Sequence, residues 1–331
     1  MIVRQFGKLE PARPGEIGNP VPGDGEILVD VRAAPVNYVD QLVIGGQYQF
    51  LPKLPFVPGK GPSGVVAAVG KRVAGLAVGD RVLAMVEQGG YAEQVTVAAN
   101  QCYRIPDAMS FAEAASMSLA YDTAWFALRE RARVTAGETV LVLGASGAVG
   151  RASIQLAKAM GARVLAGISR LEKTQAVLGA GADATVDLSG ENLRDELRER
   201  VQAANNGNNA DVVLDPLGGD FFDAALRAVA WCGRVVVIGF AAGRIPTLKV
   251  NYLLLKNIEI SGLQVSDYRK RKPAQVARCY AELFELYAQG KLRPDAVTTY
   301  PLDQAERALG SLRDRTATGR PVLVLEGGSG A

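Results

Sequence analysis

The sequence contains no histidine among its 331 residues, and this absence excludes a whole class of chemistry. Without imidazole, the chain has no histidine general base, proton shuttle or metal ligand. Only three cysteines are present, Cys102, Cys232 and Cys279, and they lie too far apart for the ligand spacings of a zinc site. An odd number of widely separated cysteines is typical of reduced thiols. We therefore expect no metal site.

Long apolar segments are also missing. The first ten residues, MIVRQFGKLE, lack the apolar core of a signal peptide, and no run of about 18 apolar residues occurs. The formal net charge of +3 is spread along the chain, so neither a membrane nor nucleic acid is expected as a partner. The local exception is the basic run Arg269–Lys272, which we interpret as a solvated loop before a helix at Pro273, with phosphate or RNA contact as the alternative. The sequence predicts a cytoplasmic protein.

Two kinds of secondary structure divide the chain. Before residue 110, glycine and proline separate short strands, which is typical of an all-β module. These strands are Glu26–Ala33, Gly64–Val69, Asp80–Val86 and Tyr91–Val97. From Ser110, which forms a capping box with Glu113, helices alternate with strands. The six strands are Val140–Leu143, Arg163–Ile168, Ala184–Val186, Asp211–Leu214, Arg234–Gly239 and Ile258–Ser261. This alternation predicts an α/β fold with a doubly wound parallel sheet.

The turn after the first of these six strands has the spacing of a dinucleotide-binding fingerprint. Ala145, Gly147 and Gly150 stand where the motif carries three glycines, with alanine in place of the first. Gly147 would let the backbone approach a pyrophosphate, and Gly150 would let the helix pack closely on the strand. The predicted pyrophosphate-binding residues are Ala145, Ser146, Gly147, Ala148, Val149 and Gly150. A plain glycine-rich turn is the alternative.

The end of the second strand indicates which nicotinamide nucleotide is used. No acidic residue ends this strand, where Asp or Glu would bind the ribose 2′-hydroxyl of NAD. Ser169, Arg170 and Lys173 follow it instead, a hydroxyl and two cations suited to a 2′-phosphate. The sequence therefore predicts NADPH as the cofactor. Alternatively, Arg170 and Lys173 are solvated cations at the start of a helix.

The order of these parts, together with several motifs, resembles the medium-chain dehydrogenase/reductase superfamily. The motifs are PGKGPSGVVAAVG at Pro58–Gly70, GDRV at Gly79–Val82 and GGYAEQ at Gly89–Gln94. The turn GASGAVG and the segment Asn251–Asn257 are similar to those of the zinc-free quinone oxidoreductase branch. This resemblance implies a GroES-like β-rich catalytic domain at 1–121 and 264–331. It also implies a Rossmann NADPH-binding domain at 122–263.

The resemblance extends the expected cofactor site beyond the fingerprint. Thr123 matches the threonine that meets the nicotinamide in this superfamily. Gly239 and Phe240 are similar to the backbone wall beside the nicotinamide, and Gly218 resembles the turn near the adenosine ribose. Asn251, which opens the segment shared with the quinone oxidoreductase branch, completes the expected set.

The resemblance also implies chemistry without zinc. Positions that match the zinc ligands of the superfamily's alcohol dehydrogenases hold Asn37, Lys60 and Leu119, none of which offers a thiolate or an imidazole. Val39 stands where those enzymes carry a hydroxyl that relays the substrate proton. What remains is hydride delivery from NADPH to an acceptor that is already electrophilic, such as a quinone or an enone.

Three residues are candidates for polarising the oxygen of the acceptor. Tyr48 lies in a segment similar to the one that places the proton-donating tyrosine of 2-enoyl thioester reductases, or it is a pocket-lining aromatic. Asn37 could donate its amide N–H to a carbonyl, or tie down its own loop. Lys60 could replace zinc as an electrophile, or be a loop lysine turned to solvent.

The leading interpretation is an NADPH-dependent, zinc-independent reductase of quinones or related enones. Reduction of a 2-enoyl thioester is an alternative that Tyr48 favours. A non-catalytic NADPH-binding protein that also binds RNA is a second alternative, supported only by Arg269–Lys272. Because Ile258–Ser261 is expected at the sheet edge, where it could pair with its copy, we also expect a homodimer.

Overall fold

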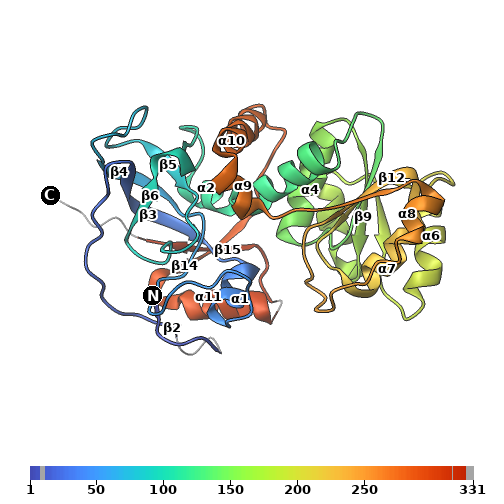
Figure 1. Ribbon diagram of the computed structural model, residues 1–331, viewed down its shortest axis with the longest axis horizontal. Coiled ribbons are helices and arrows are strands. Elements are labelled where there is room, and N and C mark those ends of the chain that lie inside the picture. The colour runs from blue at the N-terminus through green and yellow to red at the C-terminus, as the bar shows by residue number, and fades with distance from the viewer. Residues whose placement is uncertain (8–11, 315, 326–331) are drawn as a thin grey trace. The chain divides into compact units, whose positions relative to one another are not determined.

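The chain folds into two compact units, each with its own sheet (Figure 1). The computed structural model describes residues 1–7, 12–314 and 316–325. The first unit comprises Met1–Leu119, Arg269–Phe284 and Pro294–Ala331, and the second comprises Ala120–Tyr268 and Glu285–Arg293. The boundaries predicted from the sequence, 1–121 with 264–331 and 122–263, do not include the return of Glu285–Arg293 to the second unit.

The second unit contains a six-stranded parallel sheet with the order β10-β9-β8-β11-β12-β13. Its strands are β8 (Thr139–Val142), β9 (Arg163–Ile168), β10 (Ala184–Asp187), β11 (Ala210–Asp215), β12 (Val229–Val237) and β13 (Glu259–Gly262). The order reverses between β8 and β11, and ligands of such sheets bind at the carboxyl ends of the strands near this point. The predicted doubly wound sheet is thus confirmed.

Helices flank this sheet, with α4 on one side and α6 and α7 on the other (Figure 1). The helices are α3 (Ala120–Trp125), a π-helix (η2, Phe126–Arg131), α4 (Ala148–Ala159), α5 (Thr174–Gly179), α6 (Leu193–Ala204), α7 (Gly219–Ala228) and α8 (Asn251–Lys256), with a short 3-10 turn (η3) at Leu171–Lys173. Strand residues Val140–Leu143 and Val212–Leu214 are fully buried, as expected for central strands covered on both faces. Their apolar runs are what made these strands predictable.

The first unit is built on a mostly antiparallel sheet with the order β14-β15-β3-β4-β5-β7, to which β6 adds by pairing with β3. Its strands are β3 (Glu26–Pro35), β4 (Ser63–Val69), β5 (Arg81–Ala84), β6 (Gln94–Ala98), β7 (Cys102–Arg104), β14 (Val297–Pro301) and β15 (Arg320–Val324), and β1 (Ile2–Val3) pairs separately with β2 (Ala12–Arg13). Antiparallel pairing of β15 with β3 brings the end of the chain back to the N-terminal module. β15 therefore belongs to the same sheet as the N-terminal strands.

Helices of the chain outside the parallel sheet are α1 (Tyr38–Ile44), α2 (Phe111–Met117), α9 (Val265–Arg271), α10 (Pro273–Ala288) and α11 (Ala305–Arg313), with 3-10 turns η1 (Ala99–Gln101) and η4 (Leu302–Gln304). The predicted capping box is present at α2, where Ser110 Oγ accepts the Glu113 N–H at 3.2 Å and Glu113 Oε2 accepts the Ser110 N–H at 2.9 Å. In the described parts of the chain, no helix is long and apolar enough to cross a membrane.

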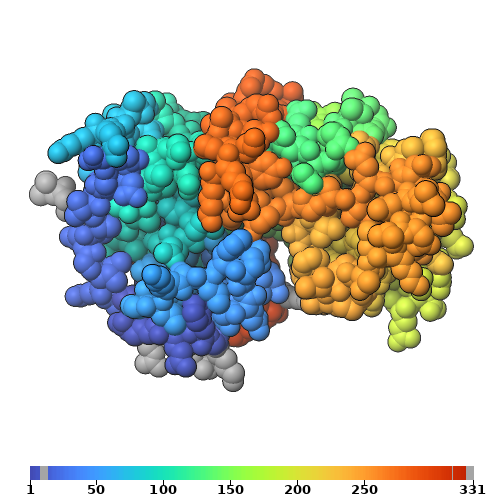
Figure 2. Space-filling view, in the orientation of Figure 1, coloured from blue at the N-terminus to red at the C-terminus, as the bar shows by residue number. Residues whose placement is uncertain are grey.

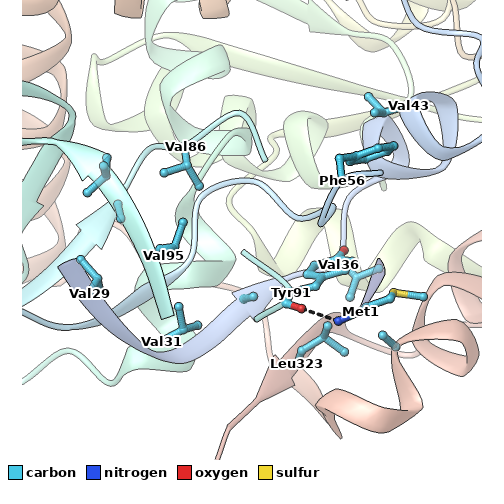
Figure 3. Packing of buried hydrophobic residues seen from close by; sticks show 14 of the residues in the cluster. Met1, Val29, Val31, Val36, Val43, Phe56, Val86, Tyr91, Val95 and Leu323 are labelled. Atoms are coloured by element: carbon cyan, nitrogen blue, oxygen red, sulfur yellow. Dashed lines mark hydrogen bonds between the residues drawn. The ribbon is translucent and has the colours of Figure 1, made fainter. Parts of the chain in front are cut away.

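The core of the first unit forms where β3 alternates between buried and partly exposed residues. Val29 and Val31 point inward and pack with Val95 and Leu323 in the cluster shown in Figure 3. Tyr91 lies fully buried in this cluster, and its carbonyl oxygen accepts a hydrogen bond from the Met1 amino group at 2.8 Å (Figure 3). The core therefore fixes the position of Tyr91, which adjoins the candidate site described below.

The interpretation of Arg269–Lys272 as a solvated loop is wrong in two respects. Arg269–Arg271 form the last turn of α9, and only Lys272 separates that helix from α10. Arg269 is only 4% exposed, because Glu87 supplies a carboxylate for its guanidinium. The exposed part of the run is limited to Lys270, Arg271 and Lys272.

Candidate active site

The fingerprint forms the turn between β8 and α4. Gly144 has a φ of +60°, and Gly147 is the N-cap of α4. A Cβ on Gly150 would lie 2.5 Å from the Gly144 carbonyl oxygen, so only glycine lets this helix pack so closely on the turn. Within the described chain, no side chain caps α4 and no acidic residue stands in its first turn. Its N-terminal N–H groups are suited to an anionic group.

The other residues of the turn complete this cradle. Ala145 is buried and donates its N–H to the Gly167 carbonyl oxygen at 3.0 Å, which ties the turn to β9. Ser146, Ala148 and Val149 are partly exposed. The turn thus presents backbone and small side chains, as a pyrophosphate site requires.

The two predicted cations lie near this turn, because β9 runs parallel to β8 and ends at the same edge of the sheet. Ser169 and Arg170 are exposed directly after β9, and Lys173 is partly exposed at the end of the following 3-10 turn. Arg170 Nε lies 3.8 Å from Glu172 Oε1, a long and solvent-exposed ion pair of little energy. A phosphate could compete for this guanidinium.

The ends of β11 and β12 bring together two further segments of the expected cofactor site. Asp215 Oδ1 accepts the N–H groups of Leu217 and Gly218, each at 2.9 Å, and so fixes the turn before α7. Gly218 has a φ of +66°, and a Cβ there would lie 2.8 Å from the ring of Phe240. Gly239 follows at the end of β12, and Phe240 is 42% exposed. Gly218 and Phe240 are therefore neighbours.

Sequence reasoning missed Asp215, although an acid at the end of a buried strand was a usable signal. Its side chain is fully buried, and Oδ2 has no hydrogen-bond partner among the described residues. Burial raises the pKa of the Asp215 carboxyl, while the N–H groups of Gly218 and Leu217 lower it by a smaller amount. The folded protein therefore holds this proton more tightly than the unfolded chain does.

This shift predicts a pH-dependent effect of Asp215→Asn on stability. The contribution of Asp215 to the stability of the folded protein is fully present below the ordinary pKa of a carboxyl. It is lost as the pH rises through the raised pKa of the folded state. Asparagine keeps the accepting oxygen but cannot ionise. We expect the variant's thermal unfolding temperature to rise relative to wild type as the pH increases above about 4, the ordinary pKa of a carboxyl. A difference that does not change with pH would mean that Asp215 ionises normally.

Thr123 and Asn251 occupy different environments in the second unit. Thr123 is partly exposed in α3, whose residues Tyr121, Asp122, Ala124 and Trp125 are buried. Among residues 121–125, Thr123 is thus the side chain that is accessible to a ligand. Asn251 is exposed at the start of α8, and its contact with the cofactor stays a prediction.

In the first unit, Lys60 is buried rather than turned to solvent. It stands between Gly59 and Gly61, whose φ angles are +96° and +63°. A Cβ on Gly59 would lie 2.3 Å from the Tyr91 ring, and one on Gly61 would lie 2.5 Å from Ser118 Oγ. Both glycines are therefore required for the tight packing that holds Lys60 inside. The Lys60 side chain is only 6% exposed.

The Lys60 ammonium is held by Glu87 and faces Tyr48. Lys60 Nζ donates to Glu87 Oε2 at 2.5 Å and to the Glu87 carbonyl oxygen at 2.9 Å. It lies 5.8 Å from the centre of the Tyr48 ring, which packs edge-on to Phe50 at 6.3 Å between ring centres. Tyr48 is partly buried. Two of the three residues predicted to polarise an acceptor thus lie together.

Asn37, the third candidate, is engaged within its own segment. Its Oδ1 accepts from Arg320 Nη2 at 2.6 Å, and its Nδ2 donates to the Pro35 carbonyl oxygen at 3.4 Å. Its backbone N–H donates to Asp40 Oδ2 at 2.9 Å, at the start of α1. These contacts favour the loop-fixing role that the sequence left open.

A buried carboxyl–phenol pair adjoins Asn37 and Lys60, and sequence reasoning missed it. Tyr91 donates its O–H to Asp40 Oδ2 at 3.0 Å, and both side chains are buried. Burial raises the pKa of Asp40, although the Asn37 N–H and the charge of Lys60 oppose this. Burial and the Asp40 carboxylate raise the pKa of Tyr91 well above its usual value. Because 51 residues separate the two, the sequence offered no signal of this pairing.

The described residues contain no group of three or more His, Cys, Asp or Glu side chains placed to hold a metal ion. Of the three residues that the resemblance matches with zinc ligands, Asn37 and Lys60 make the hydrogen bonds described above. Leu119 has a left-handed φ of +59°. None of these three is a ligand type that zinc prefers.

Both parts of the chain match known families. Residues 23–107 match the alcohol dehydrogenase GroES-like domain, and residues 148–282 match the family described as zinc-binding dehydrogenase. The quinone oxidoreductase-like protein 2 homolog of Nematostella vectensis is 37% identical over 304 residues, which cover 91% of this chain and 82% of that protein.

Solved structures give the same result. The quinone oxidoreductase of Pseudomonas syringae has a TM-score of 0.90 at 30% identity and covers 98% of both chains. Escherichia coli quinone oxidoreductase, crystallised with NADPH, has a TM-score of 0.89 at 28% identity and covers 98% of this chain and 99% of that one. The chain therefore belongs to the quinone oxidoreductase-like branch of the medium-chain dehydrogenase/reductase superfamily, and it is an oxidoreductase with a GroES-like and a Rossmann-type domain.

Proposed function

We propose that this oxidoreductase uses NADPH to reduce quinones or related enones by direct hydride transfer, without a metal ion. The observation that carries the proposal is the buried Lys60 ammonium beside Tyr48, at a position that matches a zinc ligand in related alcohol dehydrogenases. A fixed positive charge at that position can do the electrostatic work of a Lewis acid.

The residues of the second unit fit NADPH. Gly150 and Gly218 leave no room for a Cβ, and the uncapped N-terminus of α4 is suited to the pyrophosphate. Ser169, Arg170 and Lys173 would hold the 2′-phosphate, and Thr123, Gly239 and Phe240 would lie against the nicotinamide. Related Escherichia coli quinone oxidoreductase was crystallised with NADPH, which supports this choice. When bound, NADPH supplies a hydride.

The residues of the first unit would complete the reaction on the acceptor. An ammonium has three N–H donors, and Glu87 accepts two from Lys60. The third would donate to the carbonyl oxygen of the acceptor and stabilise the negative charge that develops there. Tyr48 would supply the proton that accompanies the hydride. Asn37 would hold the start of α1 in place.

A 2-enoyl thioester is the alternative acceptor, because its carbonyl would use the same two donors. The RNA-binding alternative has lost part of its support, since Arg269 is buried in an ion pair with Glu87. A cytoplasmic location stays a prediction from the sequence.

A comparison of acceptors tests the proposed function. NADPH oxidation is followed with metal-stripped protein in the presence of a chelator, using an ortho-quinone, a simple enone and a crotonyl thioester in parallel. Rapid turnover of the quinone or the enone is the expected result. Preference for the thioester would favour the enoyl reductase alternative, and NADPH binding without turnover of any acceptor would contradict the proposal.

Two copies of the chain are proposed to pair through the second unit. β13 is the last strand of its sheet, and the nearby α8 carries Leu254 and Leu255, which are 78% and 70% exposed. α8 lies at the surface in Figure 2, where it is orange. Apolar side chains exposed in this way are typical of an interface.

Light scattering tests this pairing. The wild-type protein is expected to be a dimer, and Leu254→Glu with Leu255→Glu to be a monomer, because each carboxylate would be buried without a partner. Val21→Glu, at a position 84% exposed in the first unit, is the matched control and should remain a dimer. A monomeric wild type would refute the proposal.

A further inference from the structure

Two cationic side chains, those of Lys60 and Arg269, contact Glu87 in the loop after β5 of the first unit. Lys60 contacts Glu87 Oε2 at 2.5 Å, and Arg269 Nη1 lies 3.2 Å from the other carboxylate oxygen, Oε1. The side chains of Lys60 and Arg269 are only 6% and 3% exposed, whereas that of Glu87 is 36% exposed. One carboxylate therefore serves two buried cations.

This arrangement limits where the Lys60 ammonium can lie. A lysine side chain has many rotamers, and its ammonium is a point charge without preferred direction. Glu87 removes that freedom, because its carboxylate and its carbonyl oxygen accept from the same Nζ. Arg269 in turn holds the second oxygen of the carboxylate. The ammonium is thereby fixed beside the Tyr48 ring.

We propose that Glu87 is a positioning residue of the reductase: it orients the Lys60 ammonium toward the acceptor oxygen, while Arg269 holds the other oxygen of its carboxylate. In this role Glu87 acts on the reaction through Lys60. This inference rests on the proposed function, because it assigns Glu87 a role through Lys60. It predicts that Glu87 affects turnover only while Lys60 is present.

Four proteins test the inference: wild type, Glu87→Gln, Lys60→Met and the double variant. Turnover of an ortho-quinone, KM for NADPH and thermal unfolding are measured for each. Glu87→Gln is expected to lower kcat by roughly 10- to 100-fold, as loss of an orienting partner does at metal sites, with KM for NADPH unchanged. In the Lys60→Met background, the same substitution should leave kcat unchanged. Glu87→Asp, which keeps the charge, should restore part of the lost turnover.

Glu306→Gln is the matched control, because Glu306 is exposed on α11 of the same unit, and it should behave as wild type. Wild-type kcat in Glu87→Gln would overturn the inference. So would an equal loss of kcat in the Lys60→Met background, since Glu87 would then act through folding. If Glu87→Gln does not fold, the comparison of Lys60→Met with the double variant decides alone. Both of these variants lack the buried Lys60 ammonium. Absence of turnover in wild type would refute the proposed function instead.

Discussion

Lys60→Met is expected to lower kcat for quinone reduction by roughly 100- to 1000-fold, the range observed when one donor to a developing oxyanion is removed. Methionine has a similar length and keeps the apolar contacts of the lysine stem, but it carries no charge. The affinity for NADPH should not change, since the predicted cofactor residues all belong to the second unit. Steady-state kinetics and a fluorescence titration with NADPH measure the two quantities.

Lys270→Met provides the control for Lys60. Lys270 also lies over an aromatic ring, at 5.2 Å from the centre of Phe50, but it is exposed. Solvent screens an exposed charge strongly, so its loss should change kcat by no more than about threefold. An unchanged kcat in Lys60→Met would remove Lys60 from the mechanism.

Arg170→Ala and Lys173→Ala are each expected to weaken NADPH binding by about 1.5 to 3 kcal/mol, or roughly 10- to 150-fold in Kd. NADH has no 2′-phosphate, so its affinity should be unaffected. The two variants therefore shift the preference between the cofactors rather than the strength of binding in general. Titrations of each variant with NADPH and with NADH give the four values needed.

Arg194→Ala is the matched control for these cations, because Arg194 is exposed on α6 of the same unit. Its removal changes the net charge equally but should leave both affinities unchanged. Equal losses for NADPH and NADH in Arg170→Ala or Lys173→Ala would mean that these cations do not recognise the 2′-phosphate.

Much of the parallel sheet could be predicted, because its central strands are apolar runs bounded by turns. Arg163–Ile168 was predicted with its observed bounds. β12 begins at Val229, five residues before the predicted start at Arg234. Trp231 is 72% exposed and Cys232 has a left-handed φ of +60°, so the first half of this strand lacks the buried apolar pattern that marks the second half.

The ionic cluster of the first unit could not be predicted in the same way. Lys60 and Glu87 are 27 residues apart, and Arg269 is 182 residues from Glu87. No local pattern links such residues, since their contact depends on how the whole unit folds. A basic run read alone indicates solvent exposure, which is why Arg269 was assigned to a loop. Its burial and its contact with Glu87 become visible only in the folded unit.

Isotope transfer in a single turnover tests the central claim, metal-free direct hydride transfer, most directly. Chelator-treated protein is mixed with NADPH that carries deuterium at the transferable position of the nicotinamide, then with a simple enone, and the product is analysed by mass spectrometry. We predict one deuterium on the carbon β to the carbonyl, together with a slower reaction than with unlabelled NADPH. A product without deuterium, or a reaction abolished by the chelator, would contradict direct hydride transfer without a metal.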